Sequence, residues 1–223
     1  MKRIHATTFA VALLACAAPA YAQQDIDKVF GGITAEAGRQ YGDLETVNGG
    51  IDLEDGARVE DAETVNGGID GGDDVQARSL ATVNGGIHLG ERVQVTDDLE
   101  TVNGGISIGR GGRIGGDVAT VNGAIELVDT DLAGSIETVS GNVTVGAGSH
   151  VRGGLRIEKP DGGFGFHMGK RKPPVVVIGP GAVVDGPLVF EREVELYVHD
   201  SARTGAIRGA TAIRFSTSTP PGR

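Results

Sequence analysis

Acidic side chains are the most abundant candidates for chemistry in this sequence. Between Asp43 and Glu100 there are 15 Asp and Glu residues against three Arg residues. Carboxylates can hold a hard cation such as Ca²⁺, and a carboxylate pair in a groove can hydrolyse a glycosidic bond. The glycine-rich nonapeptide that binds Ca²⁺ is missing, and the stretch Gly-Gly-Asp-Asp at 71–74 is a slight substitute for it. We therefore expect a solvated acidic surface without a metal site.

The histidines do not form a recognisable catalytic or metal-binding set. His88, His150, His167 and His199 have no metal-ligand spacing among them, and the sequence contains neither a Gly-x-Ser-x-Gly elbow nor a phosphate-binding loop. An acyltransferase would have to use His150 or His199 between subunits. We predict that the chain is not an enzyme and takes no cofactor. A groove lined by clustered Asp, Glu and Arg would favour the alternative, a polysaccharide-active enzyme.

The segment 159–173 concentrates apolar and basic side chains among glycines, in a chain of net charge −10. Its basic residues suit an anionic partner, such as envelope polysaccharide, lipid or the acidic face of another copy. The alternative is a loop whose apolar side chains fold back over a flank of the molecule. The candidate contact residues are Phe164, Phe166, Met168, Lys170, Arg171 and Lys172.

A hexapeptide repeat must position these residues. Thr-Val-Asn-Gly-Gly-Ile occurs four times, followed by two decayed copies, at residues 46–51, 64–69, 82–87, 101–106, 120–125 and 138–143. The steps are 18, 18, 19, 19 and 18 residues, and Val-Phe-Gly-Gly-Ile at 29–33 fits as a degenerate first copy. Fixed self-similarity at a short period is typical of a stacked repeat.

The period predicts an all-β fold, a single-stranded parallel β-helix. A helix pair needs roughly 33 residues, so a unit of 18 or 19 residues suits one coil of short strands. A second frame, apolar-x-Gly-x-apolar, has its glycines at Gly116, Gly134, Gly153, Gly186 and Gly205. The step of 33 between Gly153 and Gly186 indicates one coil plus an insertion at 159–173. We expect nine or ten coils to about Ile213, in a right-handed coil; the hexapeptide-like segment 178–183 is the argument for a left-handed one.

The repeated asparagines predict an internal ladder. At a spacing of one coil each side-chain amide can donate to the carbonyl of the next, which would satisfy buried polar groups and set the register. The predicted ladder consists of Asn48, Asn66, Asn84, Asn103 and Asn122. Asn-Gly-Gly also tolerates positive φ, so we expect the sharp corner of each coil there. Because Leu44 and Val47 are both apolar and three apart, we expect a bend between them.

Stacking also places like charges next to one another. Asp52 should neighbour Asp70, and Glu45 should neighbour Glu63. Two such charges about 4.8 Å apart repel by nearly 1 kcal/mol in water. The second column contains Ala81 and Ala119, which limits the repulsion.

The amino-terminal sequence predicts export. Lys2 and Arg3 precede an apolar stretch, and Ala-Tyr-Ala at 20–22 is a cleavage motif before Gln23. We expect a signal peptide at 1–22, a solenoid at 23–213 and a flexible tail at 214–223. The product would be periplasmic or secreted. The alternative is a lipoprotein anchored at Cys16, because Leu-Leu-Ala-Cys resembles a lipobox.

Composition narrows the classes of partner. The chain has no Trp and only 4% aromatic residues, which argues against stacking on sugars or bases, and its acidity argues against nucleic acid. The 38 glycines suit the corners of coils.

On its Thr-Val-Asn-Gly-Gly-Ile repeats and the segment 179–188, the chain resembles bacterial putative-adhesin β-solenoids, and more loosely the polymer-forming bactofilins. The first resemblance implies an exported envelope protein without known catalysis. We therefore expect a non-enzymatic cell-envelope scaffold, structural or adhesive. The alternative is a polymer that assembles through the solenoid ends.

Overall fold

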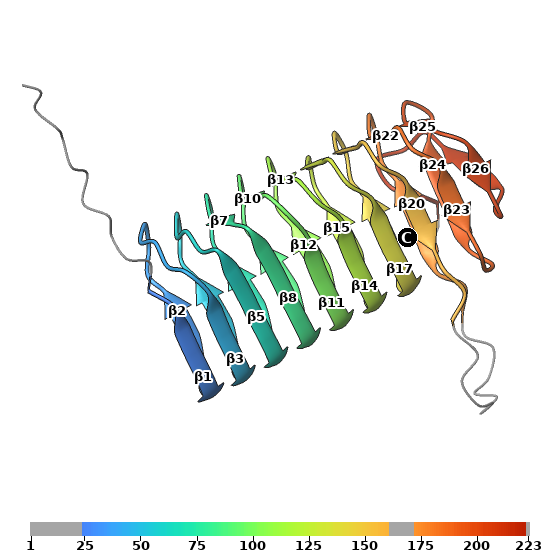
Figure 1. The fold of residues 1–223 in the computed structure, drawn as a ribbon. Coiled ribbons are helices and arrows are strands. Elements are labelled where there is room, and N and C mark those ends of the chain that lie inside the picture. Colours follow the sequence, from blue (N-terminus) through green and yellow to red (C-terminus); the bar gives the residue numbers. More distant parts are fainter. Residues whose placement is uncertain (1–23, 161–171, 222–223) are drawn as a thin grey trace, which may run out of the picture.

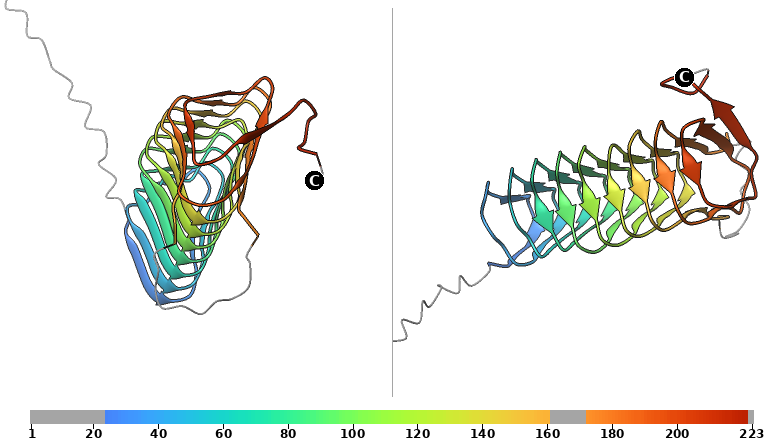
Figure 2. Two further views of the ribbon diagram at one scale, coloured as in Figure 1. Left: turned by 90° about the vertical axis from the view of Figure 1, so that its right-hand side faces the viewer. Right: turned by 90° about the horizontal axis from the view of Figure 1, so that it is seen from above.

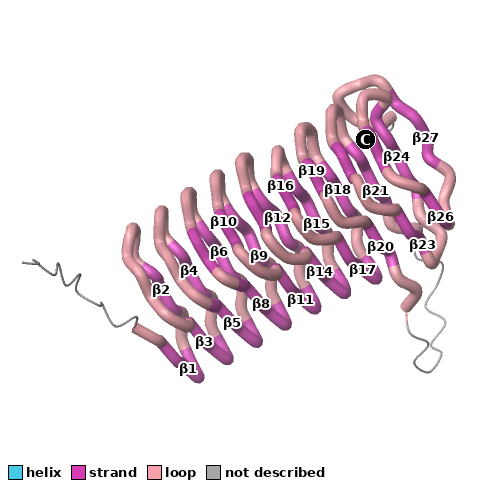
Figure 3. Tube along the Cα trace, turned by 45° about the horizontal axis from the view of Figure 1, so that its top comes forward, coloured by secondary structure: helices cyan, strands magenta, loops and turns pink. Residues whose placement is uncertain are grey.

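The chain folds into a β-solenoid of parallel strands in stacked coils (Figure 1). The structure is a computed structural model that describes residues 24–160 and 172–221. Successive coils follow one another along a rod, and the view along the rod shows each coil as an elongated closed loop (Figure 2). The described residues form strands joined by short loops and contain no helix (Figure 3). The predicted all-β parallel β-helix is confirmed.

Three sheets run along the rod. Sheet A contains the strands that carry Thr-Val-Asn, together with their equivalents in the other coils. Its strands are β1 (Ile26–Phe30), β3 (Leu44–Asn48), β5 (Asp61–Asn66), β8 (Ser79–Asn84), β11 (Leu99–Asn103), β14 (Val118–Asn122), β17 (Ile136–Ser140), β20 (Leu155–Ile157), β23 (Leu188–Phe190) and β26 (Ile207–Arg208). Thr-Val-Asn itself lies in β3, β5, β8, β11 and β14. With ten strands about 4.8 Å apart, the rod is on the order of 45 Å long.

Sheet B follows the glycine pair of each repeat. Its strands are β2 (Ile33–Ala35), β4 (Ile51–Leu53), β6 (Ile69–Gly71), β9 (Ile87–Leu89), β12 (Ile106–Ile108), β15 (Ile125–Leu127), β18 (Val143–Val145), β21 (Val175–Ile178), β24 (Glu195–His199) and β27 (Ala212–Phe215). Sheet C closes the coil with two-residue strands: β7 (Gln76–Ala77), β10 (Gln94–Val95), β13 (Arg113–Ile114), β16 (Asp131–Leu132), β19 (His150–Val151), β22 (Val183–Val184) and β25 (Arg203–Thr204).

The register of the sheets follows the sequence repeat. Thr46 pairs with Thr64 and Ile51 with Ile69, so each residue meets its equivalent one coil away. Phe30 pairs with Asn48, which confirms 29–33 as the first copy. Apolar residues at equivalent positions therefore stack along the rod, and the buried side chains form a continuous core.

The insertion lies where the second glycine column predicts it. Leu155 pairs with Leu188, a step of 33 residues, yet the two strands are neighbours in sheet A. A Cβ on Gly186 would lie 2.3 Å from the carbonyl oxygen of Gly153, so the two glycines stack directly. In the sequence, the extra residues fall between β20 and β21. The last strand ends at Phe215, close to the predicted end of the solenoid.

The expected bend between Leu44 and Val47 is wrong. Residues Leu44–Asn48 form one strand, in which Leu44 and Thr46 are buried while Glu45 and Val47 are exposed. Threonine takes the inward place because its hydroxyl finds an acceptor there: Thr82 Oγ1 donates to the Gly67 carbonyl oxygen of the preceding coil at 2.8 Å. The same bond recurs at Thr46, Thr64, Thr101 and Thr120.

The glycines of the repeat are required for close stacking and not for positive φ. Among these glycines only Gly31, in the first copy, has a positive φ. A Cβ on Gly104 would lie 1.8 Å from the Gly85 carbonyl oxygen, which no side chain can tolerate. The first eight coils each have a positive-φ residue between sheets B and C, and these residues are Gly38, Gly56, Asp74, Arg92, Gly111, Asp129, Gly148 and Gly181. The predicted corner at Asn-Gly-Gly is therefore present, as the bend between sheets A and B, but the positive φ expected there is wrong.

Candidate functional site

The outer face of sheet A carries a column of exposed valines. Strand alternation turns the valine of each repeat outward, because the threonine before it points into the core. Val47, Val65, Val83 and Val121 are each 40% exposed. We call the set Val29, Val47, Val65, Val83, Val102, Val121 and Val139 the valine column. An aliphatic stripe of this length on a surface is a marker of an interaction site.

An acidic column runs beside it, on the other side of the buried threonines. The predicted neighbours Glu45 and Glu63 are paired, and Glu63 then pairs with Ala81. The complete acidic column, with its two alanines, is Asp27, Glu45, Glu63, Ala81, Glu100, Ala119 and Glu137. On sheet B, Asp52 and Asp70 are also neighbours as predicted, and the next residue in that column is His88.

A groove of about 740 Å³ lies over these two columns. It extends from Asp27, Lys28 and Val29 in the first coil to Val139 and Glu158, a length of roughly 30 Å at 4.8 Å per coil. We call it the sheet A groove. Its lining contains carboxylates but no arginine, so this groove does not present the Asp, Glu and Arg set expected of a sugar-cleaving enzyme.

The middle of the groove carries negative charge that no nearby cation among the described residues balances. Within residues 24–160 and 172–221, no cationic side chain lies within 4.0 Å of the carboxylates of Glu45, Glu63 or Glu100. At the far end, the Arg156 guanidinium lies 3.9 Å from Glu137 and 3.2 Å from Glu191. At the near end, Lys28 Nζ donates to the carbonyl oxygen of Gly32 at 2.6 Å. The middle of the groove therefore has exposed carboxylates on one side and exposed valines on the other.

The asparagine ladder is present but lies on the surface. Asn66 Nδ2 donates to Asn48 Oδ1 at 3.1 Å, and the bond repeats at 3.0 to 3.1 Å through Asn84, Asn103 and Asn122. All five side chains are exposed, so the expectation of an internal ladder is wrong. The asparagine ends its strand at a corner, where the alternation that would turn it inward stops. The ladder uses one of the two N–H donors of each amide.

The chain has no match among known protein families, curated proteins or solved structures.

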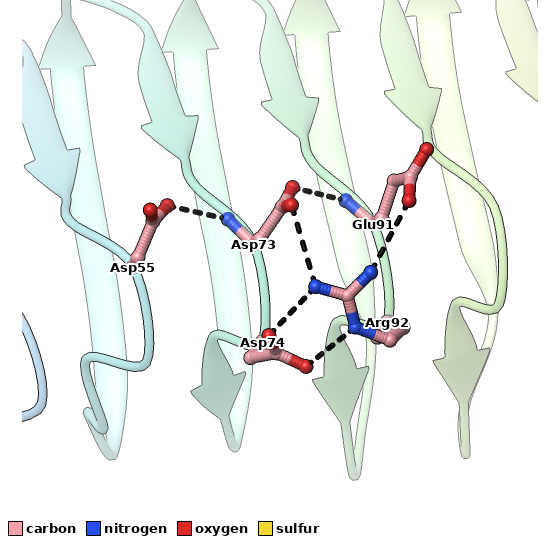
Figure 4. Close-up of polar contacts among 5 residues, drawn as sticks. All are labelled: Asp55, Asp73, Asp74, Glu91 and Arg92. Atoms are coloured by element: carbon pink, nitrogen blue, oxygen red, sulfur yellow. Dashed lines mark hydrogen bonds and ion pairs between the residues drawn. The ribbon is translucent and has the colours of Figure 1, made fainter.

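Aspartates cap the backbone of the next coil, a role that the sequence analysis missed. Asp55 Oδ1 accepts the backbone N–H of Asp73 at 2.9 Å, and Asp73 Oδ1 accepts that of Glu91 at 2.8 Å (Figure 4). Asp98 and Asp117 do the same at another corner. The signal in the sequence was the recurrence of Asp at steps of 18 or 19 residues. Part of the acidic surface therefore holds the coils in register.

Arg92 neutralises the densest of these acidic corners. Its Nε and Nη2 donate to the two carboxylate oxygens of Asp74 at 2.8 and 2.7 Å, and Nη1 contacts Glu91 at 3.2 Å (Figure 4). The hydrogen bond from Arg92 lowers the pKa of the Asp74 carboxyl below its ordinary value, and the same bond raises the pKa of Arg92. Asp74 and Arg92 also have positive φ, at 58° each. This ion pair thus joins two residues that both have a backbone conformation that favours glycine.

The described histidines lie apart from one another. His88 Nδ1 contacts Ser107 Oγ at 2.9 Å, His150 Nε2 contacts Asp185 Oδ2 at 2.7 Å, and His199 Nδ1 contacts Ser201 Oγ at 2.8 Å. In the part of the chain that the structure describes, no three His, Cys, Asp or Glu side chains are arranged to hold a metal ion. The same residues include no helix long and apolar enough to cross a membrane.

Most of the contact residues predicted in the insertion cannot be placed in the structure. Phe164, Phe166, Met168, Lys170 and Arg171 lie outside the described residues. Lys172 is described and exposed, just before β21. The predicted signal peptide at 1–22 is likewise outside the described residues.

Proposed function

We propose that this chain is a non-enzymatic, exported scaffold of the bacterial cell envelope, whose lateral faces make structural or adhesive contacts. The observation that carries the proposal is the valine column of the sheet A groove. Aliphatic side chains aligned on one face supply apolar surface that a partner can cover. The sequence adds an amino terminus typical of export and a resemblance to putative-adhesin solenoids.

Several features of the rod suit a scaffold. Threonine hydroxyls, asparagine amides and aspartate carboxylates each bond one coil to the next, in addition to the parallel sheets. Repeated bonds of this kind make neighbouring coils support one another, so side chains on the faces keep a regular spacing. A regular face can engage a repetitive or extended partner at many points.

The amino terminus of the mature protein tests the export proposal. Mass spectrometry of the protein from fractionated cells should find Gln23 as the first residue, in the periplasmic or secreted fraction. A lipid-modified Cys16 as the first residue, found in the membrane fraction, would instead favour the lipoprotein alternative. An unprocessed chain in the cytoplasm would contradict export altogether.

Self-assembly through the ends is a second candidate, favoured by one observation. The first coil exposes apolar side chains beside an edge strand: Val29 is 61% exposed and Phe30 is 78% exposed. Open strand edges pair readily with other chains. Sedimentation over a hundredfold concentration range decides between the two proposals. The scaffold proposal expects a constant monomer, whereas filaments would grow with concentration and shorten in a Phe30→Glu variant.

A further inference from the structure

We propose that the sheet A groove binds an extended, cationic, amphipathic polypeptide segment lying along the rod. The inference rests on the proposed scaffold function, because it names the class of partner that the exposed face would hold. Four observations support it: the length of the groove, the distribution of its charge, the spacing of its carboxylates and the sign of the net charge of the chain.

The shape of the groove suits a binding site for one extended chain. The groove has a volume of about 740 Å³ and is roughly 30 Å long, so it is much longer than it is wide. The valine column offers the side chains of such a chain an aliphatic wall, since each central valine keeps about two fifths of its surface exposed. A partner with aliphatic residues on one side would cover this wall.

The charge of the groove is distributed, which distinguishes a polypeptide from a lipid. Glu45, Glu63, Glu100 and Glu137 lie along the groove, and Asp27 and Glu158 lie at its two ends. A lipid carries its charge at one end, so it would leave most of these carboxylates without a partner. A chain with Lys or Arg at intervals meets them along its length.

The spacing of the central carboxylates suits a polyproline-type conformation. Ala81 and Ala119 remove every second carboxylate, so Glu63, Glu100 and Glu137 are two coils apart, or about 9.6 Å. A polyproline II chain repeats every three residues, about 9.3 Å. Basic residues at every third position therefore stay in register with all three carboxylates. In a β-strand, side chains on one face recur about every 6.6 Å, which does not match.

A second copy of this chain suits the groove less well. Two identical faces would bring acidic columns together, and the chain has a net charge of −10. The acidic column therefore repels the same column of a second copy and attracts a basic segment. The inference therefore commits to a basic polypeptide, and association of two copies through the valines is an outcome that the test can detect.

Titration with a designed peptide tests the proposal on the mature protein. The probe is a fluorescein-labelled peptide of four Lys-Val-Pro triplets, followed by fluorescence anisotropy at low and physiological salt. The matched control is (Lys-Lys-Val-Val-Pro-Pro)₂, which has the same composition and charge but a different spacing. We expect the triplet peptide to bind at least tenfold more tightly than the control, with an affinity that falls as salt rises. Equal affinities, or no binding, would overturn the proposal.

Paired charge variants locate the site. A Glu63→Gln/Glu100→Gln protein should bind the triplet peptide at least tenfold more weakly. An Asp52→Asn/Asp70→Asn protein, which loses the same charge from exposed positions on sheet B, should bind within twofold of the wild type. Equal losses in both variants would mean non-specific attraction and would overturn the assignment. Circular dichroism melting confirms that both variants are folded.

Sedimentation of the same proteins separates the remaining outcomes. A wild-type dimer that becomes a monomer in a Val83→Asp variant would show that a second copy covers the groove, against this proposal. A wild-type protein that is folded and monomeric but does not bind the peptide would contradict the proposal of a polypeptide partner. Neither result bears on export, which is measured by the amino terminus of the mature protein, so failure of this inference is distinguishable from failure of the proposed function.

Discussion

At the scale of single residues, each coil is joined to the preceding one by polar contacts that recur at the same position of the repeat. The buried threonine hydroxyls donate to glycine carbonyl oxygens of the preceding coil, at 2.8 to 3.1 Å. The column ends at Thr138, whose buried Oγ1 has no hydrogen-bond partner among the described residues. The same residue type is thus satisfied at five positions and unsatisfied at a sixth.

This difference predicts opposite effects of one substitution. Thr82→Val should lower the free energy of unfolding by about 1 kcal/mol, because valine keeps the shape of threonine but cannot donate to Gly67. Thr138→Val should be neutral or stabilising, because it removes a buried hydroxyl without a partner. Urea unfolding of the two variants measures both values. Equal losses at the two positions would contradict the bonding that we describe.

The glycines of the repeat differ in how closely they are stacked. A Cβ at Gly67 would lie 1.9 Å from the carbonyl oxygen of Gly49, whereas one at Gly50 would lie 3.3 Å from that of Gly68. Gly67→Ala should therefore destabilise the protein by about 3 kcal/mol or more, since two coils must separate. Gly50→Ala should cost about 1 kcal/mol or less, because a shift of a few tenths of an ångström relieves it. Thermal melting compares the pair, and a reversed order would contradict the stacking.

At the scale of elements, the corner between sheets B and C carries the main electrostatic arrangement. Arg92 pairs with Asp74 there, and the aspartates of neighbouring coils accept backbone N–H groups. Because Arg92 lowers the folded-state pKa of Asp74, the ion pair stabilises the fold above the ordinary pKa of 3.8. That contribution is lost as the pH falls through the lowered pKa.

The sign of this shift gives a pH-dependent prediction. Arg92→Gln should be less stable than the wild type at neutral pH, and the difference should shrink as the pH falls below 3.8 towards the lowered pKa of Asp74. Arg110→Gln is the control, since the described residues place no carboxylate within 4.0 Å of Arg110. Unfolding by urea at pH 7, 4 and 2.5 makes the measurement. A constant difference at all three pH values would mean that the effect of Arg92 is not electrostatic.

The positions and register of the strands could be predicted from the sequence, whereas the direction of their side chains could not. The steps of 18 and 19 residues predicted the coil, the register and the first copy, because a repeat can only bury its apolar side against its neighbours. The second glycine column located the insertion by the same logic. The sequence alone did not show that Thr46 points inward and Val47 outward, because both are β-branched residues that suit a strand.

The groove escaped prediction for the same reason. Its existence depends on the valines being outside, and its acidity depends on the column of Glu45 lying on the same face. The capping aspartates were read as a solvated surface, since their acceptor role needs the path of the neighbouring backbone. The Asp periodicity was present in the sequence and could have suggested it.

At the scale of the whole molecule, the rod presents its three sheets as faces of different chemistry. Sheet A combines valines with carboxylates, sheet B carries Asp52, Asp70 and His88 in one outward column, and sheet C carries Gln76 and Gln94 in another. The central claim is that the face of sheet A is the one that contacts a partner. An exposed aliphatic column beside exposed carboxylates distinguishes that face from the other two.

Site-specific photo-crosslinking in intact cells tests this claim most directly. A photoreactive amino acid is placed at Val83 on sheet A, at Ser107 on sheet B or at Gln94 on sheet C, one position in each protein. We predict a discrete crosslinked product from position 83, with a mass that is not twice that of the chain, and none from positions 94 and 107. Products from 94 or 107 but not from 83 would contradict the account, as would a product of twice the mass from 83.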